Sequence, residues 1–163
     1  MRSNQRIAMY PGTFDPITYG HIDLIERGLK IFDRVIVGVA VNEPKQPLFS
    51  AAERVDMVRR TIGRKKNIEV ETFKGLVVDF AKQKKVTVLM RGVRMLSDFE
   101  YEFQMALTNR KLNPNMETIF LMPNESYAYL TSRLIKETAL LGADVRTYVP
   151  PYVYDCLQSK IVR

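Results

Sequence analysis

Five short apolar stretches along the chain predict β-strands, at residues 7–10, 34–41, 68–73, 86–90 and 118–122. The second stretch is almost continuously apolar, which is typical of a strand buried on both faces of a parallel sheet. The third alternates between apolar and polar residues, which indicates a strand with one face in solvent. The fold is therefore expected to be built around a β-sheet.

Apolar residues at helical spacing predict helices between and after these strands. The predicted helices cover residues 22–32, 51–62, 76–84, 97–112 and 131–141. Ser50 and Glu53 form a capping-box pattern at the start of the second helix. Gly63 and Gly142 are expected to end the second and the fifth helix.

Three further details follow from the same patterns. The helix at 97–112 has an apolar stripe, expected to face the core, made of Phe99, Phe103, Ala106 and Leu107. Asp98 is expected to cap that helix. Residues 145–149 are expected to form a short extended piece, after which Pro150 and Pro151 introduce a final short helix.

Strands alternate with helices along the whole chain, and no repeats or linkers interrupt them. This alternation predicts an α/β fold with a Rossmann-like, doubly wound sheet of five parallel strands. A length of 163 residues suits one domain, so residues 1–163 are expected to form a single domain. Ligands of such sheets bind beyond the carboxyl ends of the strands. The candidate ligand-binding stretches are 11–21, 42–47, 91–94 and 123–133.

Composition and charge narrow the class of protein. Apolar residues make up 46% and charged residues 26%, which fits a globular domain and excludes a disordered chain. No apolar run is long enough to span a membrane and no signal peptide is evident, so a cytoplasmic protein is expected. Cys156 is the sole cysteine and no zinc-type cluster occurs, so neither a disulfide nor a protein-held metal is predicted. The net charge of +7 favours anionic partners, which leaves a nucleic-acid-binding domain as an alternative.

The most informative stretch runs from Tyr10 to His21 and joins the first strand to the first helix. Two prolines and two glycines permit a tight turn that exposes the first amides of the helix. Those amides, with the positive end of the helix dipole, attract anions. Thr13 and Thr18 add hydroxyls, and His21 is the only histidine. We interpret the stretch as a phosphate-binding loop, and an ordinary strand-to-helix turn is the alternative.

Basic side chains follow two other predicted strands. Lys45 lies between two prolines after the second strand, where a flexible ammonium can reach a phosphate. Arg91 and Arg94 come directly after the fourth strand, with Gly92 beside Arg91. Arginines held on such a rigid element are suited to phosphate recognition. Taken alone, each of these residues is more simply interpreted as a solvated surface charge.

Three motifs, in the same order, resemble those of one enzyme family. Gly-Thr-Phe-Asp-Pro-Ile-Thr-x-Gly-His at residues 12–21 resembles the signature of the nucleotidyltransferases with an [His/Thr]-x-Gly-His motif, and its Thr-x-Gly-His form is similar to that of the phosphopantetheine adenylyltransferases. Residues 91–102 resemble that family's second motif, Arg-Gly-[Leu/Val]-Arg followed by Asp-Phe-Glu-Tyr-Glu. Residues 127–137 resemble its third motif. The resemblance covers nearly the whole chain.

This resemblance implies roles for residues of all three motifs. His21 would be the catalytic residue that stabilises the transition state. ATP would be bound by Thr13, Phe14, His21, Gly92, Val93, Arg94, Glu102, Tyr127, Ala128, Tyr129, Leu130, Thr131, Ser132 and Arg133. The acceptor, phosphopantetheine, would be bound by Thr13, Lys45, Val77 and Arg91. Arg133 departs from the family pattern, because it stands where the family has a third serine.

The implied reaction transfers AMP from ATP to 4′-phosphopantetheine and yields dephospho-coenzyme A and pyrophosphate. The acceptor phosphate is already a nucleophile at neutral pH, so direct in-line displacement requires no general base. Phosphates beside His21 would favour its charged form. Magnesium is expected to accompany ATP, held mainly by phosphate oxygens and water.

The family resemblance also implies a homohexamer and feedback inhibition by coenzyme A. Neither property follows from the spacing or composition of the chain. A nicotinamide-mononucleotide adenylyltransferase or a cytidylyltransferase shares the first motif, so both remain alternatives.

Overall fold

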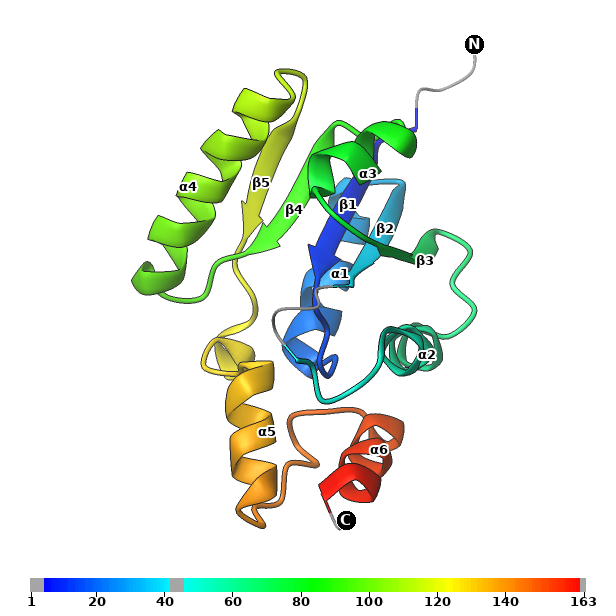
Figure 1. Cartoon of the computed structure of the whole chain (residues 1–163), viewed down its shortest axis with the longest axis vertical. Helices are drawn as coiled ribbons and strands as arrows, with labels where there is room; N and C mark the ends of the chain where they lie inside the picture. The colour runs from blue at the N-terminus through cyan, green and yellow to red at the C-terminus, as the bar shows by residue number, and fades with distance from the viewer. Residues whose placement is uncertain (1–4, 42–45, 162–163) are drawn as a thin grey trace.

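The computed structural model describes residues 5–41 and 46–161, and its centre is a five-stranded parallel sheet (Figure 1). The strands are β1 (Ile7–Gly12), β2 (Arg34–Ala40), β3 (Ile68–Phe73), β4 (Val88–Gly92) and β5 (Glu117–Leu121). All neighbouring strands run parallel, in the spatial order β3-β2-β1-β4-β5. The five predicted strands and the doubly wound parallel sheet are confirmed.

The order in which strands are added to the sheet changes direction at β1. From β1 the chain adds β2 and β3 on one side, and then it crosses back to add β4 and β5 on the other. In doubly wound sheets such a reversal opens a crevice between the two central strands, beyond their carboxyl ends. The topology therefore predicts a ligand site where β1 and β4 end.

The helices agree with those predicted from apolar spacing. They are α1 (Tyr19–Ile31), α2 (Ala51–Ile62), α3 (Val77–Gln83), α4 (Leu96–Leu112), α5 (Ser132–Leu140) and α6 (Pro151–Ile161), with a 3-10 turn, η2 (Glu125–Tyr127). The Ser50–Glu53 capping box forms at the start of α2. Figure 1 shows α5 and α6 beyond the carboxyl ends of the strands. Within the described ranges, none of these helices has the length and apolar character needed to cross a membrane.

Side chains that alternate along β1 and β2 point into two apolar clusters on opposite faces of the sheet. Tyr10 and Val37 belong to the larger cluster, which includes residues of α1, α2, α5 and α6. Met9 and Ile36 belong to the smaller cluster, which includes residues of α3. Both faces of β2 are thus buried, which accounts for its continuously apolar sequence.

Residues 145–149 do not form the extended piece expected from the sequence. They form a turn in which the Tyr148 amide donates to the Val145 carbonyl at 3.0 Å. Val145 and Val149 are both fully buried in the larger cluster. The prediction was wrong because apolar residues four apart can be buried by a turn as well as by a strand.

Helix α4 departs most from the prediction. Phe99, Phe103 and Leu107 were expected to face the core, but they are 40%, 47% and 49% exposed. The buried residues of α4 are Glu102 and Asn109. These polar side chains face inward because α4 forms a wall of two cavities, and the apolar stripe is consequently turned outward.

Asp98 does not cap α4. The N-cap position is Met95, and Asp98 lies within the first helical turn. There its carboxylate accepts a hydrogen bond from Arg94 Nε at 3.0 Å. The prediction failed because the helix starts before Ser97, although a carboxylate in the first turn still interacts favourably with the helix dipole.

Candidate active site

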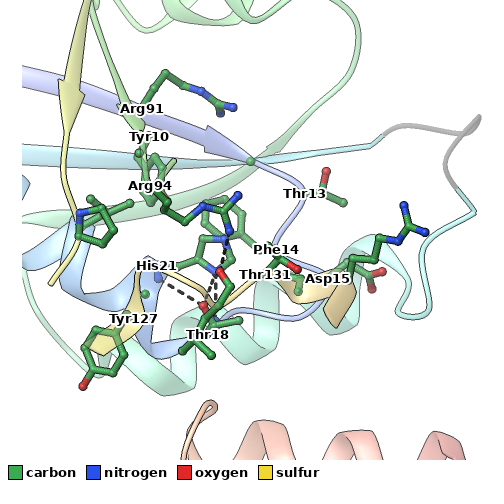
Figure 2. Close-up of a pocket in the computed structure, with 18 of the residues that line it drawn as sticks. Tyr10, Thr13, Phe14, Asp15, Thr18, His21, Arg91, Arg94, Tyr127 and Thr131 are labelled. Carbon is green, nitrogen blue, oxygen red and sulfur yellow. Dashed lines mark hydrogen bonds between the residues drawn. The ribbon is translucent and has the colours of Figure 1, made fainter. Parts of the chain in front are cut away.

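A cavity of about 690 Å³ lies at the carboxyl ends of β1 and β4 (Figure 2). Its walls come from three segments: the loop from β1 to α1, the end of β4 with α4, and the segment that leads into α5. These segments contain three of the four stretches selected from the sequence. Of the fourth stretch, 42–47, Pro47 lines the cavity and Lys45 lies outside the described residues.

Phe14 shapes the first wall of the cavity. Its backbone has a φ of 50°, a left-handed conformation that is costly for a residue with a side chain. Its buried ring lies edge-on to the rings of Tyr10 and His21, at centroid distances of 5.4 and 5.1 Å. A Cβ atom on Gly12 would lie 2.9 Å from the Phe14 ring, so glycine is required for this packing. The backbone of Thr13 and Phe14 is thereby held at the border of the cavity.

His21 lies at the start of α1 with one ring nitrogen already engaged. The Thr18 backbone N–H donates to His21 Nδ1 at 3.1 Å, and Thr18 Oγ1 accepts from the His21 amide at 3.4 Å. Together these bonds form a capping box, and Figure 2 shows dashed lines between Thr18 and His21. Because Nδ1 accepts a hydrogen bond, the proton of the neutral ring lies on Nε2.

The surroundings of His21 keep its imidazole neutral. Burial, together with the positive charges of Arg94 and Arg91, lowers the pKa of His21 to about 4. Bound phosphates were expected to favour the charged form of His21. Burial and the two arginines instead favour its neutral form. A neutral imidazole still donates one hydrogen bond through Nε2, which is enough to stabilise negative charge that develops on a neighbouring oxygen.

Arg91 is held in place by two partners at the end of β4. It forms a bidentate ion pair with Glu102 of α4, with distances of 2.7 Å from Nε to Oε2 and 2.5 Å from Nη2 to Oε1. Its Nη1 also donates to the Pro11 carbonyl at 2.5 Å. Although burial lowers the pKa of Arg91, the hydrogen bonds and charge of Glu102 raise it by more, so Arg91 stays charged. These contacts join β1, β4 and α4 around the cavity.

The segment before α5 is tied to the other two walls. Arg94 Nη1 donates to the Leu130 carbonyl at 2.6 Å, which connects the loop after β4 to this segment. Ser132 Oγ donates to the Pro16 carbonyl at 2.8 Å, which connects it to the first loop. Thr131 caps α5 through its side chain. The three sequence motifs therefore meet at one place.

Two basic residues of α5 border the cavity. Lys136 forms an ion pair with the buried carboxylate of Asp15. Arg133 pairs with Glu137 at 2.8 Å, and its side chain is 87% exposed. Lys136 was not among the predicted site residues. Its place inside the third motif, four residues after Ser132 on the same face of α5, could have pointed to it.

Comparisons with known proteins relate the chain to nucleotidyltransferases. Residues 9–138 match the sequence pattern of the cytidylyltransferase-like family. A phosphopantetheine adenylyltransferase from Caldanaerobacter subterraneus subsp. tengcongensis is 50% identical over 155 residues, which cover 95% of this chain and 97% of the relative. The chain belongs to the phosphopantetheine adenylyltransferase family.

Solved structures of more distant nucleotidyltransferases share the fold. A putative nicotinate-nucleotide adenylyltransferase from Vibrio parahaemolyticus has a TM-score of 0.68 at 19% identity, over 95% of this chain and 93% of that chain. A nicotinic acid mononucleotide adenylyltransferase from Plasmodium falciparum, complexed with NaAD, has a TM-score of 0.68 at 16% identity, over 93% of each chain. At these identities the likeness establishes the fold alone.

The cavity of this nucleotidyltransferase brings together most of the residues predicted to bind ATP. The predicted residues that line it are Thr13, Phe14, His21, Arg91, Gly92, Arg94, Glu102, Tyr127, Leu130, Thr131, Ser132 and Arg133. Lining residues that were not predicted include Asp15, Leu24 and Lys136. Asp15 could have been found from its place inside the first motif, whereas nothing in the motifs indicated Leu24.

Three residues predicted to bind ATP do not line the cavity. The amide of Val93 donates to the Leu121 carbonyl at 3.0 Å, which turns this residue toward β5. The amide of Ala128 donates to the Glu125 carbonyl at 3.2 Å within the η2 turn. The ring of Tyr129 packs edge-on against Tyr148 at 6.1 Å. Motif position alone did not reveal these local contacts.

A second cavity, of about 270 Å³, adjoins the first at residues that line both, among them Thr13 and Arg91. Its remaining lining is largely apolar and includes Leu76, Val77, Met105 and Ala106. Val77, predicted to bind the acceptor, therefore lines only the second of the two cavities. Asn109 also lines this cavity, is only 8% exposed, and forms no side-chain hydrogen bond with another described residue.

Proposed function

We propose that this chain transfers AMP from ATP to 4′-phosphopantetheine, yielding dephospho-coenzyme A and pyrophosphate. The observation that carries the proposal is the junction of two cavities at Thr13 and Arg91. The larger cavity, with His21 and its basic side chains, suits phosphates. The smaller one, with its apolar lining and the side-chain amide of Asn109, suits a long uncharged arm that contains amide groups. The name of the relative that is 50% identical supports the same acceptor.

In the proposed reaction an oxygen of the acceptor phosphate attacks the α-phosphorus of ATP. The bond from this phosphorus to the bridging oxygen of the leaving pyrophosphate breaks. His21 Nε2 and the amides that precede α1 donate to the α-phosphate oxygens, whose negative charge grows in the transition state. Arg91, oriented by Glu102, and Thr13 align the acceptor phosphate.

The nucleotide is proposed to lie along the wall made by Arg94 and the segment before α5. Arg133, at the edge of the cavity, is proposed to contact the outer phosphates. The roles of Lys45, Val93, Ala128 and Tyr129, which the family resemblance implies, stay predictions.

Magnesium enters this proposal as part of the MgATP substrate. Within residues 5–41 and 46–161, no group of three or more His, Cys, Asp or Glu side chains could hold a metal ion. The cavity carboxylates Asp15 and Glu102 are each paired with a basic side chain. We therefore expect the phosphate oxygens and water to be the ligands of the ion.

Pyrophosphate release from MgATP tests the proposal. We expect release to require phosphopantetheine and to be negligible without it. Release with nicotinamide mononucleotide in place of phosphopantetheine, or with CTP in place of ATP, would assign the chain to one of the alternative nucleotidyltransferase activities. Salt-dependent binding of DNA or RNA without pyrophosphate release would support the nucleic-acid-binding alternative.

We further propose that the outer face of α4 mediates self-assembly, into the hexamer expected from the family. Leu96, Phe99, Phe103 and Leu107 follow helical spacing and are at least 40% exposed, so they form a contiguous apolar face. Sedimentation velocity measures the assembled mass, and the double variant Phe103→Glu/Leu107→Glu should lower it. Inhibition by coenzyme A, which the family resemblance implies, can be measured in the same pyrophosphate assay. The cytoplasmic location stays a prediction.

A further inference from the structure

Arg54, near the start of α2, is a buried charge beside the candidate active site. It is 1% exposed and forms no salt bridge within the described residues. Its guanidinium donates to the carbonyls of Thr13 at 2.6 Å, Ala40 at 2.8 Å and Phe49 at 3.1 Å. Burial of a guanidinium costs free energy through lost solvation, which these hydrogen bonds and the negative charge of Asp15 partly offset. An apolar side chain would fill this space without that cost, so the three bonds call for a specific explanation.

The bond to Thr13 sets the orientation of the Thr13–Phe14 peptide. In a trans peptide the C=O and the N–H that follows it point in opposite directions. Because the Thr13 carbonyl points to Arg54, the Phe14 N–H points away from Arg54. Thr13 and Phe14 line the larger cavity, whereas Arg54 does not. The Phe14 N–H therefore faces the cavity side of the loop.

This peptide would not hold that orientation by itself. Phe14 has a φ of 50°, which an L-residue rarely adopts without external restraint. Its amide donates none of the backbone hydrogen bonds found in the described loops and turns. Within residues 5–41 and 46–161 this amide has no hydrogen-bond acceptor, and the bond from Arg54 to the Thr13 carbonyl fixes its direction.

Asp15 of the loop makes the reciprocal contact, with the residues that precede α2. Its carboxylate accepts from the amides of Leu48 at 3.0 Å and Phe49 at 2.9 Å, directly before α2. The first loop thus holds the start of α2, while Arg54 of α2 holds the first loop. The two sets of bonds lock the loop and the helix to each other.

We propose that Arg54 is a positioning residue, which keeps the Phe14 amide directed at the α-phosphate oxygens in the transition state. This inference rests on the proposed function. Removing one pre-oriented donor of this kind lowers kcat by about 10²-fold to 10³-fold in enzymes that use it. Arg54 acts through the peptide and touches neither substrate.

Steady-state kinetics of Arg54→Met and Arg54→Lys test the proposal, with Arg59→Met as the matched control. Arg59 is on the same helix and donates to the Val70 carbonyl at 3.0 Å, away from the loop. We expect Arg54→Met to lower kcat by about 10²-fold, and Arg54→Lys to recover about tenfold because it restores one hydrogen bond. The KM values should change much less. Equal kcat for Arg54→Met and Arg59→Met overturns the proposal.

Amide NMR of the uniformly ¹⁵N-labelled wild-type protein provides a test that does not depend on how well Arg54→Met folds. We expect α,β-methylene-ATP to shift the Phe14 amide resonance, and the shift to be smaller in Arg54→Lys. A Phe14 resonance that does not move, while the amides of Gly20 and His21 do, overturns the proposal. Absence of pyrophosphate release by the wild type would contradict the proposed function instead, and the Phe14 shift would still decide whether this amide binds an anion.

Discussion

The loop from β1 to α1 and helix α4 border the same cavity, yet they are built in opposite ways. In the loop the ring of Phe14 is buried, and the polar groups of Thr18 and Asp15 are satisfied by nearby amides. In α4 the polar residues Glu102 and Asn109 are buried, and the apolar stripe is exposed. The polar groups of the loop are therefore satisfied by the chain itself, whereas much of the apolar stripe of α4 is exposed in the single chain. Catalytic geometry and assembly should accordingly respond to different substitutions.

The largest effect is expected from His21→Ala, which removes the donor that the loop is built to present. We expect kcat to fall by about 10²-fold to 10³-fold because the transition state loses one hydrogen bond to its developing charge. The Kd for ATP, measured by calorimetry, should change little. Near-wild-type turnover of this variant would contradict the role assigned to His21.

Arg91→Ala should weaken acceptor binding before it weakens nucleotide binding. We expect the KM for phosphopantetheine to rise by about 10-fold to 100-fold, as for the loss of a charge-assisted hydrogen bond of about 1.5–3 kcal/mol. The double variant Arg91→Ala/Glu102→Gln serves as the control, since it removes the unpaired buried carboxylate. If the KM for phosphopantetheine stays unchanged while that for ATP rises, the two substrates have been assigned to the wrong walls.

The loop should also make stability depend on pH through His21. Its folded pKa of about 4 lies below the ordinary value near 6.5, so the unfolded chain binds more protons between these values. The unfolding free energy is therefore not reduced by His21 above pH 6.5. As the pH falls from 6.5 toward 4, protonation of His21 in the unfolded chain lowers the unfolding free energy by up to about 1.4 kcal/mol per pH unit. Urea unfolding at pH 7, 6 and 5 measures this slope. An identical slope in His21→Gln would show that His21 is not the group responsible.

The smallest effect on the single chain is expected from Phe103→Ser on the outer face of α4. Its ring is 47% exposed, so we expect the unfolding free energy of the dissociated chain to change by no more than about 0.5 kcal/mol. Phe14→Ala, in the loop, should cost about 3–5 kcal/mol. Urea unfolding at protein concentrations that dissociate the assembly compares the two. A loss above about 2 kcal/mol for Phe103→Ser would mean that the stripe packs within one chain, in conflict with its exposure.

The two regions were also unequally predictable. The bonds between Thr18 and His21, and between Ser50 and Glu53, join residues three apart, so a motif contains both partners. The Arg94–Leu130, Arg54–Thr13 and Lys136–Asp15 contacts join residues 36, 41 and 121 apart. Motif spacing carries no information about such pairs. The predicted residues of the loop, Thr13, Phe14 and His21, do line the larger cavity, whereas Arg54 and Lys136 were not predicted.

Apolar spacing along the chain was sufficient to give the order and type of almost every element, because a period of 2 or 3.6 residues follows directly from backbone geometry. The motifs were sufficient to indicate the family and the strand ends that border the larger cavity. Folding in three dimensions was needed to show which face of α4 is buried, that two cavities meet at Arg91, and that Arg54 holds the Thr13 carbonyl. Each of these depends on contacts between distant segments, and such contacts exist only after the sheet brings those segments together.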